Sequence, residues 1–174
     1  GSAEISGTIS GIKGDAHMWQ GTNGTAIHLR NNATGTLTAT GLIENVTAND
    51  DRSNIVYLNS SDFTMDNGSI INNHAENSAN PKTHGIYSVD SKADQRNEVR
   101  INGEICGING NPLQIANTNV NIGETGNLHN NFVNYGALYL QKNATADIYG
   151  KINNNTATGR GGGIGTAGHG FVEI

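Results

Sequence analysis

The sequence has few cysteine, proline, aromatic and charged residues. Its 174 residues include one cysteine and two prolines, 5% are aromatic and 14% are charged. A single cysteine, Cys106, excludes an internal disulfide framework and a zinc site made of several cysteines. No run of about 18 apolar residues occurs, so no membrane-spanning helix is expected. A net charge of −5, a pI near 5.6 and no basic patch argue against nucleic acid as a partner.

Glycine and asparagine are abundant instead, with 24 Gly and 27 Asn in the chain. Both residues tolerate left-handed backbone conformations and are frequent in turns. Disordered chains of low hydrophobicity usually also carry a high net charge, which this chain does not. We therefore expect a folded chain that turns often, and its length predicts one domain over residues 1–174.

Six segments of the chain share one pattern. Each begins with two apolar residues separated by a single residue, at Ala3/Ile5, Leu37/Ala39, Phe63/Met65, Val99/Ile101, Val120/Ile122 and Ala146/Ile148. A G-x-[IL]-x-[NG] unit follows, starting at Gly7, Gly41, Gly68, Gly103, Gly126 and Gly150. A second pair of apolar residues separated by one residue comes next, at Ile27/Leu29, Val56/Leu58, Leu113/Ile115, Leu138/Leu140 and, with a gap, at Ile86/Val89; the sixth segment has Ile164/Thr166. The period of about 23 to 35 residues is typical of solenoid and array proteins.

All three units of the repeat alternate with a period of two residues, which indicates β-strands, and no segment has a sustained helical apolar face. Three short strands per repeat, separated by Gly/Asn turns, predict an all-β fold: a parallel β-helix of about six coils. An Asn amide can donate and accept hydrogen bonds, so stacked Asn side chains can satisfy one another. We expect such a buried ladder at Asn45, Asn72, Asn130 and Asn154, with Gly11 and Gly107 at the same position.

Three stretches carry a family resemblance. They are DFTMDNGSIINNHAENSANPKTHGIYSV (62–89), TADIYGKINNNTATGRGGGI (145–164) and NNFVNYGALYL (130–140). This pattern resembles the F-T-M-x-G-G-x-I-x-x-N-x-A…G-G-G-I repeats of pectate-lyase-like β-helices in large bacterial surface and adhesin-like proteins. As a pattern, the resemblance covers most of the chain. It implies a right-handed, single-stranded parallel β-helix (β-solenoid), an extracellular or cell-surface location, and a segment of a larger surface or secreted protein.

The chain shows no recurrent catalytic or metal-binding pattern. An enzyme on polysaccharides would need carboxylates converging from neighbouring coils. Glu4, Asp147 and Glu173 share one outward position, but the intervening coils carry Thr38, Thr64, Arg100 and Asn121 there. The six histidines lack a zinc-ligand spacing. Cys106 aligns with Ile71 and His129 at an outward position but has no recurrent His partner. We therefore predict no catalytic residue, no metal and no cofactor.

The best candidate for a binding site is a column of outward side chains on the second apolar strand. It consists of His28, Tyr57, Tyr87, Gln114 and Tyr139, with Gly165 last. Parallel strands lie about 4.8 Å apart, so the rings are expected to form a stripe up one face. Exposed rings in a row are suited to stacking on the apolar faces of sugars. Alternatively, aromatic residues favour strands and pack on each other in a purely structural ladder.

Loops that enter this strand in the first three coils add to the candidate site. They are 13–24, 47–54 and 74–84, and they contain Trp19, Asp50 and Asp51. Loops held by a rigid scaffold are frequent binding sites. We expect any ligand site toward the N-terminal coils, although Trp19 is equally suited to covering the first coil as a lid. The ligand-binding prediction comprises Trp19, His28, Asp50, Asp51, Tyr57, Tyr87 and Tyr139.

These observations favour a non-catalytic, adhesin-like binding module that recognises carbohydrate or a cell-surface glycoprotein. Two alternatives stay open at this point. One is a polysaccharide lyase or hydrolase. The other is a stalk or assembly segment without a ligand, whose unpaired strand edges would support head-to-tail self-association.

Overall fold

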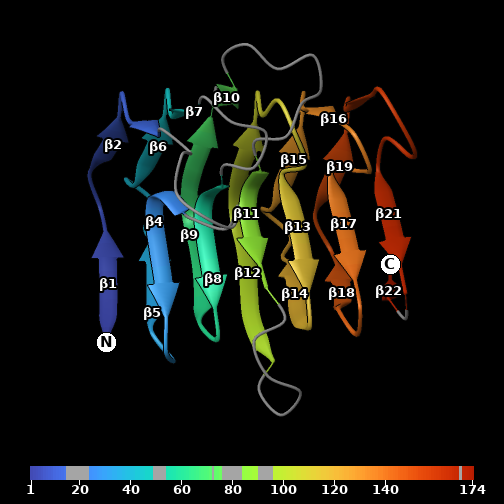
Figure 1. Cartoon of the computed structure of the whole chain (residues 1–174), viewed down its shortest axis with the longest axis horizontal. Coiled ribbons are helices and arrows are strands. Elements are labelled where there is room, and N and C mark those ends of the chain that lie inside the picture. The colour runs from blue at the N-terminus through green and yellow to red at the C-terminus, as the bar shows by residue number, and fades with distance from the viewer. Residues whose placement is uncertain (15–23, 49–53, 72, 76–83, 90–95, 169) are drawn as a thin grey trace.

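The computed structural model describes residues 1–14, 24–48, 54–71, 73–75, 84–89, 96–168 and 170–174. All regular elements in these ranges are β-strands, and all of their pairings are parallel. Two large sheets lie one in front of the other, and strands run in opposite directions in the two layers (Figure 1). The prediction of an all-β fold with parallel strands is confirmed.

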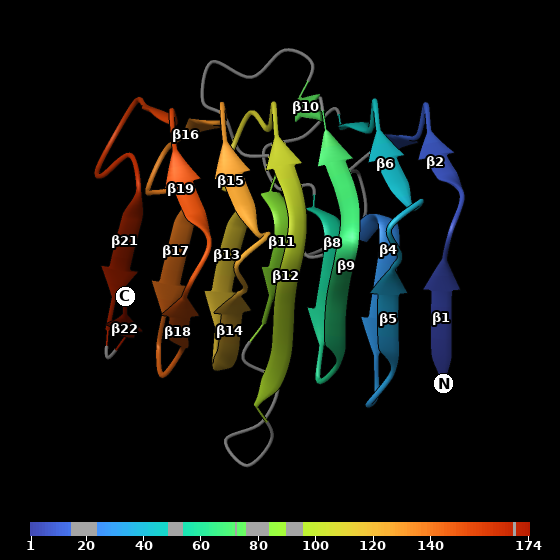
Figure 2. The same cartoon turned by 180° about the vertical axis from the view of Figure 1, so that it is seen from behind.

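An eleven-stranded sheet forms one layer (Figure 2). Its main path is β1 (Ser2–Ile5), β5 (Thr34–Leu37), β9 (Asp62–Ile71), β12 (Asn97–Cys106), β14 (Thr118–Ile122), β18 (Thr145–Ile148) and β22 (Phe171–Glu173). The remaining strands are β2 (Thr8–Ser10), β6 (Leu42–Glu44), β15 (Asn127–His129) and β19 (Lys151–Asn153). The first two strand units of each repeat therefore lie in the same sheet, and in β9 and β12 they form one continuous strand.

A six-stranded sheet forms the other layer, in the order β21-β17-β13-β11-β8-β4. These strands are β4 (Gly24–Arg30), β8 (Asn54–Asn59), β11 (His84–Ser88), β13 (Leu113–Ala116), β17 (Leu138–Gln141) and β21 (Ile164–Ala167). Two small sheets are formed by short strands that follow a strand of the eleven-stranded sheet along the chain and precede a strand of the six-stranded sheet. One is β3 (Lys13–Gly14), β7 (Thr47–Ala48) and β10 (His74–Ala75), and the other is β16 (Phe132–Val133) and β20 (Thr156–Ala157).

The core lies between the two layers and is made by the alternating apolar residues of the repeats. Phe63 and Met65 in the eleven-stranded sheet and Ile115 and Leu140 in the six-stranded sheet are fully buried. Each such side chain contributes about 1.5–3 kcal/mol of transfer free energy. Two predicted core positions are wrong. In the second repeat the inward pair is Gly35/Leu37, and Ala39 is exposed.

The second wrong core position is in the third repeat, where Ser88 rather than Val89 pairs in register with Leu58 and is buried. The Ser88 hydroxyl accepts a hydrogen bond from the Ala116 amide and lies 2.8 Å from the Thr118 hydroxyl. The hydroxyl is therefore satisfied inside the core, which an apolar pattern does not reveal.

The glycine of the G-x-[IL] unit lies at a bend in the eleven-stranded sheet, where neighbouring backbones approach closely. A β-carbon on Gly103 would lie 2.2 Å from the Gly68 carbonyl oxygen, and one on Gly150 would lie 2.3 Å from that of Gly126. Any side chain at these positions would collide with backbone. A similar approach to a backbone oxygen explains the glycine in five of the six units, those starting at Gly41, Gly68, Gly103, Gly126 and Gly150, whereas a β-carbon on Gly7 would have nothing within 4 Å.

The recurring Asn at the end of that unit has a different role from the predicted one. Asn45, Asn130 and Asn154 have φ values of 51–52°, and Gly11 and Gly107 have φ values of 68° and 65°. All three asparagines are exposed, so the prediction that they form a buried ladder is wrong. Asn is the non-glycine residue that best tolerates this left-handed turn. Asn72 lies outside the described residues.

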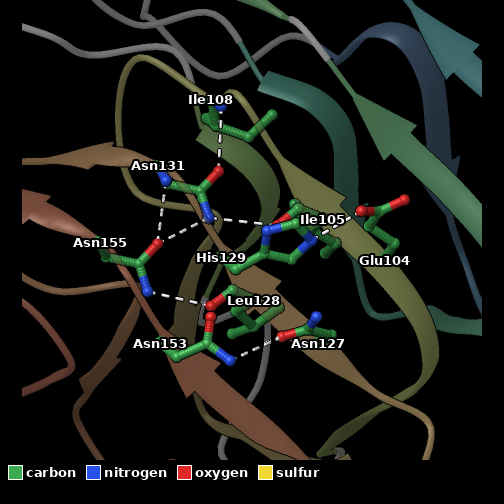
Figure 3. A network of polar contacts seen from close by, with 9 residues as sticks. All are labelled: Glu104, Ile105, Ile108, Asn127, Leu128, His129, Asn131, Asn153 and Asn155. Atoms are coloured by element: carbon green, nitrogen blue, oxygen red, sulfur yellow. Dashed lines mark hydrogen bonds and ion pairs between the residues drawn. The ribbon is translucent and has the colours of Figure 1, made fainter.

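A buried asparagine column exists one residue further along the chain (Figure 3). Asn131 accepts a hydrogen bond from the Ile108 amide at 3.0 Å and donates to the Ile105 carbonyl at 3.1 Å. It also donates to Asn155 at 2.9 Å, and Asn155 donates to the Leu128 carbonyl. Asn73 bonds the backbone in the same way through the Val46 amide and the Ile43 carbonyl. The Asn side chains therefore replace the backbone pairing that is lost at the corner.

Candidate ligand-binding face

The predicted aromatic column is present on the outer face of the six-stranded sheet. Its register runs from His28 to Tyr57, Tyr87, Gln114 and Tyr139, and then to Gly165. Inward residues on either side of each member fix this arrangement, because a shift by one residue would turn the apolar set outward. The in-register alignment of these side chains, inferred from the repeat pattern alone, is confirmed.

The rings of the column pack on one another. His28 meets Tyr57 edge to face, with ring centroids 4.8 Å apart, and Tyr57 stacks on Tyr87 at 6.0 Å. Both separations lie in the range of favourable aromatic pairs. Tyr57 is only 5% exposed, so the expectation that its ring is open to a ligand is wrong. The outer parts of the column are formed by His28, which is exposed, and by the half-buried Tyr87 and Tyr139.

Gln114 interrupts the rings between Tyr87 and Tyr139. Its amide oxygen accepts a hydrogen bond from Asn111, and its amide nitrogen lies 3.5 Å from the Gln141 side-chain oxygen. Asn111 also accepts bonds from the amides of Asn134 and Tyr135. The column therefore consists of two sets of aromatic side chains that are separated by the polar Gln114.

Tyr135 belongs to the same face, although the sequence pattern did not include it. Its ring stacks on Tyr139 with centroids 5.0 Å apart, and 42% of Tyr135 is exposed. A β-carbon on Gly165 would lie 2.0 Å from the Tyr135 carbonyl oxygen. Glycine at the last position of the column therefore leaves room for the segment that carries Tyr135. The sequence indicated this tyrosine only as the first residue of the Y-G-A-L run (135–138), within the stretch 130–140 that carries the family resemblance.

His84 is a second residue that the sequence pattern missed. Its ring stacks on Tyr87 at 5.5 Å. Burial lowers the pKa of His84 to about 4, and a hydrogen bond to the Asn111 backbone only partly offsets this. His84 is therefore neutral at pH 7. Among the described residues its Nδ1 atom is buried without a hydrogen-bond partner.

The other predicted site residues, Trp19, Asp50 and Asp51, lie outside the described residues. The described part of the face is not confined to the N-terminal repeats, because Tyr135 and Tyr139 come from the fifth repeat. The expectation that a ligand site lies toward the N-terminal repeats stays a prediction.

A polar cluster on the eleven-stranded sheet was not predicted. Cys106 on β12 pairs in register with His129 on β15, and Glu104 lies two residues before Cys106 on the same face. The His129 Nε2 atom is 2.6 Å from the Glu104 Oε1 atom (Figure 3). The shared outward position of Cys106 and His129 was visible in the sequence. The diagonal contact to Glu104 was not, because it depends on side-chain direction.

Burial is the main cause that raises the pKa of the Cys106 thiol to about 11, followed by the nearby Glu104 carboxylate and a hydrogen bond to it. The thiol is therefore protonated at neutral pH. This state does not suit a nucleophilic cysteine, whose pKa is normally lowered.

Carboxylates occur on the outer face of the eleven-stranded sheet but do not recur in a column. The register joins Glu4 to Thr36, Arg100 to Asn121, and Asp147 to Glu173. Thr36, rather than the expected Thr38, occupies the position in the second repeat, which follows from the corrected register of β5.

No protein-family model matches the chain, and no curated protein or solved structure matches it either. Among the described residues, no helix has the length and apolar character needed to cross a membrane.

Proposed function

We propose that the chain is a right-handed parallel β-helix, or β-solenoid, that acts as a non-catalytic binding module of a microbial cell-surface or secreted protein. The order of strand pairing supports the β-solenoid. Every repeat contributes to the eleven-stranded sheet and then to the six-stranded sheet, and each strand pairs in parallel with its equivalent in the next repeat. The resemblance to bacterial adhesin-like repeats supports the extracellular setting.

The observation that carries the binding role is the in-register column on the six-stranded sheet. His28, Tyr87 and Tyr139 occur at equivalent positions of the first, third and fifth repeats. Tyrosine combines an apolar ring with a polar hydroxyl group, which suits partners that are apolar on one side and wet on the other. Carbohydrate, free or on a cell-surface glycoprotein, has this character.

The ring geometry restricts which groups would meet the ligand. Tyr57 and Tyr87 are nearly parallel, with 11° between their planes, so their facing sides are occupied by each other. A sugar would therefore meet the exposed ring of Tyr135 and the accessible parts of Tyr87 and Tyr139. Gln114, between the two sets of aromatic side chains, would offer a sugar hydroxyl the amide hydrogen and the lone pair that are not used in its bonds to Gln141 and Asn111.

The arrangement of repeats favours weak contacts repeated along a chain over one deep pocket. Sites at a fixed spacing on one rigid body raise the effective concentration of the second contact once the first has formed. An extended glycan, or a densely glycosylated surface, would therefore bind more tightly than a monosaccharide.

Glycan-array binding of the wild-type protein, Tyr87→Ala, Tyr139→Ala and Trp19→Ala tests this proposal. Tyr149→Ala is the matched control, because Tyr149 is 69% exposed but lies at the bend between β18 and β19 in the other sheet. We expect the Tyr87 and Tyr139 variants to lose at least about tenfold in apparent affinity, a loss of about 1.4 kcal/mol. Absence of binding by the wild type to any glycan or glycoprotein, or an equal loss in Tyr149→Ala, would contradict the proposal.

A further inference from the structure

We propose that Glu104, Cys106 and His129 bind one Zn²⁺ ion on the outer face of the eleven-stranded sheet. One potential ligand atom from each residue lies within 4.8 Å of the other two. The backbone fixes this grouping, since Cys106 and His129 are direct register partners and Glu104 lies two residues before Cys106 on β12. The proposal is independent of the binding role proposed for the six-stranded sheet.

The chemistry of the three ligands selects the class of metal. Thiolate sulfur, imidazole nitrogen and carboxylate oxygen are the ligands that proteins use for Zn²⁺. Ca²⁺ and Mg²⁺ prefer six or more oxygen ligands and do not fit a set that includes a thiolate. Three protein ligands leave a fourth tetrahedral position for water. Glu104 is 44% exposed and His129 is 17% exposed, so solvent reaches the cluster.

The present geometry needs only side-chain adjustment to accept the ion. Ligands of a tetrahedral zinc ion are separated by about 3.3–3.8 Å, as follows from zinc–ligand distances of about 2.0–2.3 Å. The His129–Glu104 contact at 2.6 Å would have to widen, and the longest separation would have to shorten by about 1 Å. Rotations about the side-chain torsions of Glu104 and Cys106 supply both movements, while the strands keep their register.

Without metal, hydrogen bonds rather than a cation join the three side chains. The Cys106 thiol donates a hydrogen bond to Glu104, and the His129 ring lies against the same carboxylate. On binding, the thiol becomes a thiolate and releases one proton to solvent. The imidazole binds through an unprotonated nitrogen. A complex of Zn²⁺ with one thiolate, one carboxylate and one neutral imidazole carries a net charge of about zero.

The direct register partners of the cluster are neutral. Cys106 has Ile71 as its register partner on β9, and Glu104 has Ser69 there and Asn127 on β15. Asn153 on β19 is the register partner of His129 and donates a hydrogen bond to Asn127. An apolar neighbour beside the sulfur and an ordered amide pair beside the imidazole limit the freedom of both ligands. Such support helps to hold ligands in place around a metal.

Titration with Co²⁺, a spectroscopic probe for zinc sites, tests the proposal directly. With Cys106 kept reduced, we expect one equivalent of Co²⁺ to produce a thiolate-to-cobalt charge-transfer band, and Zn²⁺ to abolish it by displacement. Cys106→Ser should remove the band. His129→Gln and Glu104→Gln should weaken Co²⁺ binding by at least about tenfold, since even loss of outer-shell partners costs 10–100-fold. Asp147→Asn, an exposed carboxylate on the same sheet, should leave binding unchanged.

A second measurement uses the wild-type protein and so does not depend on the folding of any variant. Cys106 is the only cysteine in the chain, so thiol alkylation reports on this site alone. We expect saturating Zn²⁺ to slow alkylation at least tenfold, and a chelator to restore the original rate. Absence of a charge-transfer band in the wild type, a band that persists in Cys106→Ser, or alkylation that is unaffected by Zn²⁺ would overturn the proposal.

Discussion

The buried asparagine column and the outer tyrosine column both place like side chains at equivalent positions of the repeats, but different forces hold them. Asn131 is bonded to the Ile108 amide, the Ile105 carbonyl and Asn155. Tyr57 is held on the outside by ring contacts with His28 and Tyr87. The inner column completes the backbone hydrogen bonding, and the outer column adds packing to a sheet that is already paired. Changes in the inner column should therefore be the more destabilising.

The largest effect is expected when the inner column is broken. Asn131→Ala removes the side-chain partner of the buried Ile108 amide and of the Ile105 carbonyl, and we expect the free energy of unfolding to fall by about 3 kcal/mol. Chemical denaturation measures this value. Asn155→Ala is the matched control, because Asn155 is less buried and should cost less. Equal losses in the two variants would show that burial does not distinguish these positions.

The next effect concerns a histidine that packs against the outer column. His84 has a folded-state pKa of about 4, below its usual 6.5, so the unfolded chain binds more protons between these pH values. The free energy of unfolding should therefore fall as pH is lowered through this window. The expected loss from this group is about 2 kcal/mol between pH 7.5 and pH 5. Denaturation curves for wild type and His84→Gln at both pH values isolate this contribution, and identical pH dependence in the two proteins would contradict it.

A smaller effect is expected within the outer column. Tyr57→Leu keeps an apolar side chain but removes the ring contacts to His28 and Tyr87. We expect a loss of about 1.5 kcal/mol in the free energy of unfolding, from stacking and the smaller buried area. The same substitution at the exposed Tyr149 should change stability by less than about 0.5 kcal/mol. A loss of about 3 kcal/mol in Tyr57→Leu would remove the distinction between the two columns.

The smallest effect on stability is expected at Asn130, the exposed neighbour of the buried Asn131. Asn130→Ala puts a less tolerant residue at a φ of 52° and should cost about 1 kcal/mol, whereas Asn130→Gly should be close to neutral. Thermal unfolding of both variants measures this difference. If alanine and glycine are equivalent at this position, the left-handed backbone is not the reason for the asparagine.

The sequence predicted much of the fold because its strongest signals are local. Apolar alternation and the recurring glycines identified the strands, and the register of Tyr57 with Tyr87 followed from the repeat. Where a small or polar residue faces the core, that signal fails. Gly35 lies inward because Leu29 and Phe63 fill the space beside it, and Ser88 is buried because Thr118 and Ala116 satisfy its hydroxyl group.

The candidate sites were less predictable, because they depend on contacts between side chains. Equal spacing placed the tyrosines in one column, but it gave no information on which rings cover one another. Tyr57 was therefore expected to be open, and Tyr135 was missed. The grouping of Glu104 with His129 is diagonal across two strands, and alignment of equivalent positions pairs only Cys106 with His129.

The register of the parallel strands also determines where the chain can change in length. One residue inserted within β12 or β14 would turn the following inward side chains outward and misalign the glycine bend. Length varies instead at the corners on either side of the six-stranded sheet. Nine residues separate β3 from β4 and eight separate β10 from β11, but only four separate β16 from β17. Eight residues likewise separate β11 from β12, but only one separates β13 from β14. Insertions and deletions at these corners leave the core in register, so the segments there can change in length while the two large sheets are preserved.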